Sequence, residues 1–356
     1  MRLTTHRRLA AFAVAITAVA LAGACGSSKS TSGGSGANLS AQLLGSGSTF
    51  QKNLQEASIA KFTQANTGVT INYRGGGSGQ GKSDLANGVV DYAGTDSTLK
   101  DTEVAAFKGA TFLYFPIAGG PVTVSYNLGV DNLQLSGPTL GKIFQAKITT
   151  WNDPAIAKDN PGVNLPSTKI TVVHRNEASG TTSNFTKFLD KAAPGDWTLG
   201  HGDTVQWPPS TQGGQGNAGV ATIVKDTSGA VGYVDYADAK AAGLKFAKIQ
   251  NANGEYVAAT TDAASKALEA ATVADDLTFD PIDAKGPGVY PITAPTWIIV
   301  RAQQTNKAKG DAVKAYIKYI LDNNDSLTSQ TNYAPLPSSM KDKALAQLDK
   351  LQIPTS

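Results

Sequence analysis

The sequence contains one cysteine, Cys25, among its 356 residues, so no disulfide can form within the chain. Histidine is also scarce. Only His174 and His201 follow the first 24 residues, and neither lies in a closely spaced group of His, Asp and Glu. A catalytic nucleophile needs an adjacent base, and a metal ion needs clustered ligands. These shortages predict a protein that is not an enzyme and that holds no metal or other cofactor.

An excess of charge of one sign is missing too. The whole chain has a formal net charge of +3, and removal of residues 1–24, with their three arginines, would leave 28 basic and 28 acidic residues. A balanced surface lacks the positive field that nucleic acids or anionic membranes attract. No nucleic-acid partner is therefore expected, and a bound anion must be held by local dipoles and by one or two buried charges.

The N-terminus has the features of an export signal. Arg2, Arg7 and Arg8 precede an apolar, Ala-rich segment, residues 9–22, which is too short to span a bilayer comfortably. The letters LAGAC, which end at Cys25, resemble a bacterial lipobox, in which the cysteine is lipidated. We expect an exported lipoprotein anchored to the outer face of the cell membrane. The alternative is an ordinary signal peptide followed by an incidental cysteine.

Residues 25–39 are rich in Gly and Ser, which predicts a flexible tether. The chain beyond it, roughly 315 residues, exceeds one comfortable core, so two domains are expected. Apolar strand-like runs alternate there with helix-like segments, which is typical of α/β proteins with parallel strands. The expected helices are 50–62, 79–89, 140–144, 155–157, 182–189, 263–271 and 309–321, with a further one that follows the glycine-rich turn 213–217 and ends at residue 224. The expected strands are 69–73, 91–93, 111–117, 122–126, 170–173, 230–233 and 297–300.

One stretch has the composition of an anion site. Arg175 follows an apolar strand, and Ser179-Gly180-Thr181 then opens a helix. Such a turn offers hydroxyls and free backbone N–H groups at the positive end of a helix dipole. The arginine adds a planar, permanently charged fork that suits phosphate or carboxylate. Taken alone, the same residues also suit a helix N-cap with a surface ion pair.

Two further turns of this kind favour the anion site. GSGSTF (45–50) and GGGSGQG (75–81) each follow a short apolar run and each precede an expected helix. Ligands of α/β proteins bind at the carboxyl ends of the strands, where all three turns lie. The pattern predicts one anion surrounded by three helix N-termini.

From about residue 44 to residue 336 the chain resembles the phosphate-binding subunit of the bacterial high-affinity phosphate ABC transporter. The resemblance rests on the order and spacing of GSGSTF (45–50), INYRGGGSGQG (71–81), VDYAGTD (90–96), TLGKIFQAKITTWNDPAIA (139–157), VVHRNEASGTTSNF (172–185), GGQGNAGV (213–220), GAVGYVDYADAK (229–240) and YPITAPTW (290–297).

This resemblance implies a two-lobed periplasmic-binding-protein fold of type II with a hinge. Residues 40–118 plus 292–356 would form lobe I and residues 119–291 lobe II. The segments 118–121 and 291–293 would be the crossovers, since Gly and Pro suit a hinge. The implied partners are inorganic phosphate and the membrane permease subunits of the transporter, and the protein is expected to be a monomer.

The family's ligand contacts also carry over position by position. The implied phosphate-binding residues are Thr49, Phe50, Ser78, Asp96, Arg175, Ser179, Gly180 and Thr181. An acidic residue behind the arginine is implied at position 177, where this chain has Glu177 and the family usually has Asp. Ala178 replaces a usual glycine. These two departures affect the expected affinity more than the identity of the ligand.

Asp96 is the unusual member of this set. An ionised carboxylate only accepts hydrogen bonds, so it repels an anion unless that anion carries a proton. Phosphate near neutral pH has an O–H to donate, whereas sulfate has none. Asp96 is therefore expected to select against sulfate.

Three alternatives stay open at this stage. Another oxyanion, such as sulfate, could be the ligand, or the protein could be a secreted hydrolase of phosphate esters. GGSGQGKS (76–83) also satisfies the Walker A pattern of NTPases, in which Lys82 would bind phosphate. An exported chain meets little nucleoside triphosphate, which argues against the NTPase. In the phosphate-binding interpretation, Lys82 is expected on the outer surface of its helix.

Overall fold

The computed structural model of the protein describes residues 39–355. The predicted signal peptide, the predicted lipidation site at Cys25 and all but the last residue of the predicted tether lie outside this range. None of the helices within residues 39–355 has both the length and the apolar character needed to cross a membrane.

Strands and helices alternate along most of the chain, as predicted. The strands are β1 (Ala41–Gly47), β2 (Val69–Gly75), β3 (Tyr92–Thr95), β4 (Phe112–Tyr126), β5 (Gln134–Leu135), β6 (Thr171–Arg175), β7 (Gln212–Gly214), β8 (Ala230–Asp235), β9 (Lys245–Phe246), β10 (Lys248–Gln250), β11 (Tyr256–Val257) and β12 (Thr293–Arg301). The helices are α1 (Lys52–Ala65), α2 (Ser78–Ala86), α3 (Asp101–Ala105), α4 (Gly137–Phe144), α5 (Pro154–Asp159), α6 (Gly180–Ala192), α7 (Gly216–Asp226), α8 (Tyr236–Ala241), α9 (Thr261–Ala270), α10 (Lys307–Asp322), α11 (Asn324–Thr331) and α12 (Ser338–Gln347), followed by the 3₁₀ turn η1 (Leu348–Lys350).

One sheet runs through most of these strands, in the order β2-β1-β3-β12-β4-β8-β6-β7, and β9 also pairs with β4. The predicted parallel pairing is confirmed at both ends, where β1 is parallel to β2 and β3, and β6 is parallel to β7 and β8. The middle is antiparallel, because β12 and β4 run against each other and against their outer neighbours. A small separate sheet has the order β11-β10-β5.

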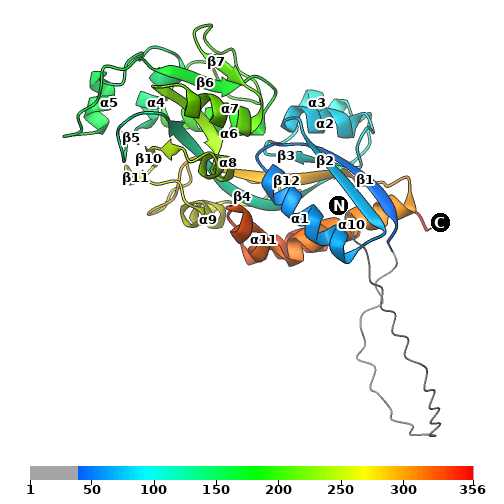
Figure 1. Cartoon of the computed structure of the whole chain (residues 1–356). Coiled ribbons are helices and arrows are strands. Elements are labelled where there is room, and N and C mark those ends of the chain that lie inside the picture. The colour runs from blue at the N-terminus through cyan, green and yellow to red at the C-terminus, as the bar shows by residue number, and fades with distance from the viewer. Residues whose placement is uncertain (1–38, 356) are drawn as a thin grey trace, which may run out of the picture. The chain divides into compact units, whose positions relative to one another are not determined.

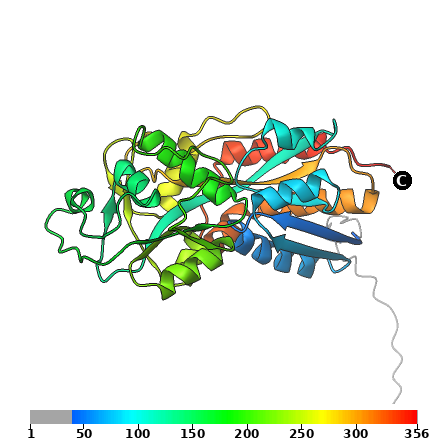
Figure 2. The ribbon, with the colours of Figure 1, turned by 90° about the horizontal axis from the view of Figure 1, so that it is seen from above.

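The centre of the sheet is two long strands that connect two groups of elements. The first part of β4 pairs with β12, and its last five residues pair with β8. Figure 1 shows β4 and β12 passing between β1–β3 with α1, α2 and α10 on one side, and β6, β7 and α4–α7 on the other. Figure 2, from above, shows the blue and the green elements of these two groups at opposite ends of the crossing strands. The fold is thus the expected two-lobed α/β fold.

The prediction that residues 118–121 separate two strands is wrong, because β4 continues through them as one strand. Gly120 pairs with Ala294 and Pro121 with Thr293, so these residues belong to one antiparallel ladder. A side chain on Gly119 would lie 2.7 Å from Leu268, which shows that this glycine permits the close approach of α9. Gly and Pro therefore lie here within a closely packed strand rather than in a turn.

The predicted helix near residues 309–321 is confirmed as α10. It begins after Asn306, whose side chain accepts a hydrogen bond from the Lys309 backbone N–H at 3.0 Å. Val313, Tyr316 and Ile320 recur at helical spacing and are buried. In contrast, α11 buries a single large apolar side chain, so its sequence carries no apolar periodicity that would have predicted it.

Candidate anion-binding site

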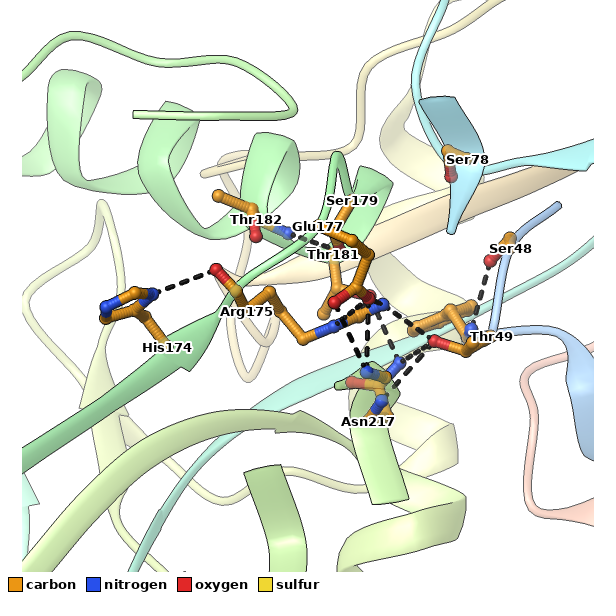
Figure 3. Close-up of polar contacts among 12 residues, drawn as sticks. Ser48, Thr49, Ser78, His174, Arg175, Glu177, Ser179, Thr181, Thr182 and Asn217 are labelled. Atoms are coloured by element: carbon orange, nitrogen blue, oxygen red, sulfur yellow. Dashed lines mark hydrogen bonds and ion pairs between the residues drawn. The ribbon is translucent and has the colours of Figure 1, made fainter. Parts of the chain in front are cut away.

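Arg175 lies at the carboxyl end of β6 and is only 3% exposed. Its Nη1 donates to Thr181 Oγ1 at 3.2 Å, and its Nη2 donates to Thr49 Oγ1 at 2.9 Å (Figure 3). Thr181 belongs to α6, while Thr49 precedes α1 at the other end of the sheet. The guanidinium therefore links two of the predicted anion turns that are far apart in the sequence.

Glu177 forms an ion pair with Arg175. Its Oε1 accepts a hydrogen bond from Arg175 Nε at 2.7 Å and is also paired with Arg175 Nη2. The Gly216 backbone N–H donates to the same oxygen at 3.2 Å. The longer side chain of Glu177 therefore still reaches the arginine. The ion pair balances part of the charge of Arg175 and fixes the plane of the guanidinium.

The start of α6 forms the second part of the site. Ser179 is the N-cap, and its Oγ accepts from the Thr182 backbone N–H at 3.3 Å. Gly180 and Thr181 begin the helix, where backbone N–H groups have no intrahelical partner. A Cβ on Gly180 would lie 2.5 Å from Ser78 Oγ, so only glycine allows α6 and α2 to meet here. The helix predicted from residue 182 thus begins two residues earlier and includes the anion turn.

The turn before α1 provides a third part. The Phe50 backbone N–H, one of the predicted donors, is 3.0 Å from Ser48 Oγ in this structure, and Ser48 Oγ in turn donates to Asp96 Oδ2 at 2.6 Å. Ser48 was not among the predicted residues. It lies within GSGSTF, but a Ser in a Gly/Ser turn cannot be distinguished from its neighbours by sequence alone.

Asp96 follows β3 and is 2% exposed. Besides Ser48, its carboxylate accepts hydrogen bonds from Ser78 Oγ at 3.3 Å and from Thr296 Oγ1 at 2.6 Å. Burial raises the pKa of Asp96 to about 6, although the hydrogen bonds from Ser48 and Thr296 and the charge of Arg175 act in the opposite direction. A carboxyl group in this environment is poised to share a proton with an acidic ligand.

Asn217, which was not among the predicted residues, completes the connection between the turns. It lies in the first turn of α7, and its Nδ2 donates to Thr49 Oγ1 at 3.2 Å and to Thr181 Oγ1 at 3.3 Å (Figure 3). Its Oδ1 accepts from the Asp235 backbone N–H at 3.1 Å, which fixes the orientation of the amide. The signal was present, because GGQGN is a fourth glycine-rich turn before a helix.

The expectation that Lys82 lies on the outer surface of α2 is wrong. Lys82 is 2% exposed, and its Nζ donates to Asp203 Oδ2 at 2.9 Å and to Glu103 Oε2 at 3.1 Å. Its neighbours in α2 gave no sign of this, because Asp203 comes from another part of the chain. A lysine engaged by two carboxylates is also not a free phosphate ligand, which argues against the Walker A interpretation.

Residues 39–355 contain no group of three or more His, Cys, Asp and Glu that could hold a metal ion. His174 stacks on Trp207 with ring centroids 4.9 Å apart, and its Nδ1 lies 2.9 Å from the backbone oxygen of Arg175. Figure 3 shows its ring on the side of β6 away from Thr49. His201 pairs with Asp190 on the surface.

A buried arginine, a protonatable carboxyl group and several helix starts at strand ends define an anion-binding protein of the two-lobed α/β type. The chain matches the PBP superfamily domain over residues 32–324. The phosphate-binding protein PstS 3 of Mycobacterium leprae is 36% identical over 312 residues, which cover 85% of this chain and 84% of that protein. The phosphate-binding protein PstS of Xylella fastidiosa is 35% identical over 308 residues, which cover 85% of this chain and 83% of that protein. The chain belongs to the family of PstS phosphate-binding proteins.

Solved structures agree with this fold. The ancestral soluble variant of the human phosphate binding protein superposes with a TM-score of 0.72 at 23% identity, over 86% of this chain and 94% of that one. A high-affinity periplasmic phosphate-binding protein, solved with bound phosphate, has a TM-score of 0.69 at 22% identity, over 89% of this chain and all of that one. At these identities the likeness concerns the fold.

Proposed function

We propose that this protein binds inorganic phosphate in the cleft between its two lobes and delivers it to an ABC-type phosphate importer, without catalysing a reaction. The observation that carries the proposal is the buried guanidinium of Arg175 between the hydroxyls of Thr49 and Thr181. Membership of the PstS family supports phosphate as the anion. The partners are then the permease subunits of that importer, and the protein acts as a monomer.

The proposed ligand set is the one implied by the sequence. The donors to phosphate are the hydroxyls of Thr49, Ser78, Ser179 and Thr181 and the backbone N–H groups of Phe50, Gly180 and Thr181. Arg175 supplies a positive charge, and Asp96 accepts a hydrogen bond from the phosphate O–H. Hydrogen bonds to charged groups contribute about 1.5–3 kcal/mol each. They cannot add in full, because desolvation of phosphate is costly and affinities end near about −20 kcal/mol. Asn217 orients Thr49 and Thr181 behind this set.

Asp96 supports phosphate over sulfate. Its carboxylate is already hydrogen-bonded by hydroxyls, as expected for a group that must stay an acceptor at the ligand. Phosphate can donate its proton to that carboxylate, whereas sulfate would place a second full negative charge beside it. Sulfate therefore remains the competing ligand to be tested, and it is disfavoured.

The proposed lobes are residues 40–118 plus 292–356 and residues 119–291. The two crossovers, in β4 and β12, pair with each other at Gly120–Ala294 and Pro121–Thr293, which supports a hinge at this point. Closure of the lobes would bring Thr49 and Ser78 of lobe I against Arg175 of lobe II. A two-lobed binding protein uses such a hinge to enclose its ligand.

We further propose that the protein is exported and attached to the outer face of the cell membrane by a lipid on Cys25. The basis is the basic and apolar segment that ends in LAGAC and the Gly/Ser-rich tether that follows it. The tether would let the folded part reach the permease while the lipid holds it at the membrane.

The function is tested by titration calorimetry of the exported protein without its signal peptide, using phosphate, sulfate and ATP. Tight binding of phosphate, weak binding of sulfate and no binding of ATP are expected. Sulfate binding equal to that of phosphate would overturn the choice of anion, and release of phosphate from added phosphate esters would show a hydrolase.

A further inference from the structure

Lys82 is a buried cation that the proposed ligand set does not use. It lies in α2 one turn after Ser78, which is proposed to bind phosphate. Its Nζ donates to Asp203 Oδ2 at 2.9 Å, to Glu103 Oε2 at 3.1 Å and to the backbone oxygen of Thr98 at 3.2 Å. A buried ammonium group is tolerated only when it is paired and hydrogen-bonded, and these three acceptors meet that need.

The two carboxylates that hold Lys82 come from different lobes. Glu103 lies in α3, in the same proposed lobe as α2, so it can stay with Lys82 whether the cleft is open or closed. Asp203 follows α6 in the other proposed lobe. The contact between Lys82 and Asp203 therefore exists only when the lobes are together. It shares no residue with the Arg175–Thr49 contact, so the two contacts can be tested separately.

Asp203 is itself attached to the proposed phosphate site. Its backbone oxygen accepts from the Ser179 N–H at 2.9 Å, and the Gly202 N–H donates to Thr186 Oγ1 in α6 at 3.2 Å. Asp203 is 5% exposed, and its Oδ1 has no hydrogen-bond partner within the described part of the chain. Together with Asp96 it lines a cavity of about 180 Å³. The ion pair thus joins the helix of Ser78 to the loop that positions Ser179.

We propose that Lys82 and Asp203 form a latch between the lobes, and that Lys82 is a positioning residue that sets how slowly the closed protein releases phosphate. The proposal rests on the phosphate-binding function proposed above. In the open protein, Asp203 returns to water and Lys82 keeps Glu103. In the closed protein without Lys82, the Asp203 carboxylate would be buried and unpaired, which penalises the closed state alone. Loss of a buried ion-pair partner acts mainly on the dissociation rate.

The test is Lys82→Met, which keeps most of the apolar stem and removes the charge. Association and release of inorganic phosphate are measured by stopped flow. We expect release to be at least about tenfold faster while association changes by less than about threefold. Lys309→Met is the matched control, because Lys309 pairs with Asp91 at 2.9 Å within the same proposed lobe and should leave release unchanged.

Asp203→Asn tests the latch from the other lobe and keeps the test valid if Lys82→Met does not fold. This substitution removes the ion pair but leaves no unpaired buried charge, because Lys82 is still paired with Glu103. Release of phosphate should therefore be accelerated less than in Lys82→Met. In the double variant, release should match Asp203→Asn alone, because the unpaired carboxylate is gone.

Two outcomes would overturn the latch while phosphate binding stands. One is release from the single variants within about twofold of the unaltered protein. The other is a release rate in the double variant that is raised by the product of the two single-variant factors, which would show that the residues act independently. Failure of the unaltered protein to bind phosphate would instead overturn the proposed function.

Discussion

At the scale of single residues, the site combines one permanent cation with one carboxyl group that can hold a proton. Arg175 is buried and contacts hydroxyls from both proposed lobes, and Glu177 neutralises part of its charge. Asp96 is equally buried, and burial raises its pKa toward the range in which phosphate also titrates. The positive charge of the site and its proton-accepting group therefore lie on two different side chains, and each can be altered separately.

Arg175→Ala should weaken phosphate binding by about 2–5 kcal/mol, because the bound anion would lose its fixed cation and Glu177 would be left without its partner. Titration calorimetry measures the change. Arg74→Ala is the control, since Arg74 is an exposed arginine on β2 and its loss should have little effect. Binding by Arg175→Ala within a factor of about three of the unaltered protein would show that the anion binds elsewhere.

Asp96→Asn should relax discrimination against sulfate more than it changes the affinity for phosphate. The amide keeps an oxygen that accepts the phosphate proton, removes the negative charge that sulfate would face and adds an N–H donor. Relief of like-charge contact in a buried site is worth several kcal/mol, so the ratio of sulfate to phosphate affinity should rise at least about tenfold. Competition of both anions at fixed pH and ionic strength measures this ratio, and an unchanged ratio would mean that selectivity lies in another group.

At the scale of elements, the site depends on how closely helix starts from the two lobes approach each other. The Gly79 backbone N–H donates to the Ala178 backbone oxygen at 3.1 Å, and a Cβ on Gly79 would lie 2.5 Å from the Ala178 Cβ. The departure from the usual glycine at position 178 is thus accommodated by a glycine on the facing helix α2. There is room for a methyl group at position 178 or at position 79, but not at both.

Gly79→Ala should therefore hinder closure and lower phosphate affinity by about tenfold or more, without a large loss of thermal stability in the absence of phosphate. Ala178→Gly in the same chain should restore binding, because it removes the methyl group that collides. Gly129→Ala is the control, since a Cβ there would meet no atom within 4 Å. Calorimetry and thermal unfolding separate the two effects, and unchanged affinity in Gly79→Ala would show that the two helices separate in the bound form.

At the scale of the whole molecule, β4 and β12 determine how the two groups of elements are joined. One antiparallel ladder pairs β4 with β12 at both proposed crossovers, so the proposed hinge motion would consist of bending and twisting of these two strands. The Arg175–Thr49 and Lys82–Asp203 contacts both join the two proposed lobes, so in the proposed mechanism closure is stabilised at two separate points. In that mechanism, release of phosphate requires both contacts to break.

The proposed attachment to the membrane is independent of the proposed phosphate site. Cys25→Ser should turn a membrane-associated protein into a released one and leave phosphate affinity unchanged, because the lipid rather than the fold would hold it at the surface. Cell fractionation with an antibody to the folded part measures the distribution. Equal retention of both forms in the membrane fraction would contradict lipidation at this cysteine.

Features that depend on near neighbours in the chain can be predicted from the sequence alone. Glycine and hydroxyl residues after apolar runs predicted helix starts at the ends of strands, and the structure confirms α1, α2 and α6 there. Parallel pairing at the two ends of the sheet followed from the alternation of strands and helices. Local backbone chemistry controls these features, so a short stretch of sequence is enough to reveal them.

Contacts between distant residues become visible only in the folded protein. Thr49 contacts Arg175, which is 126 positions away, and Lys82 contacts Asp203, which is 121 positions away. Neither the hydrogen bond to the Thr49 hydroxyl nor the burial of Lys82 can therefore be predicted from the neighbouring sequence. Residues 118–121 look like a turn until pairing with β12 makes them a strand. Burial, ion pairing and strand pairing are set by groups far along the chain, because the free energy of a side chain depends on what surrounds it in space.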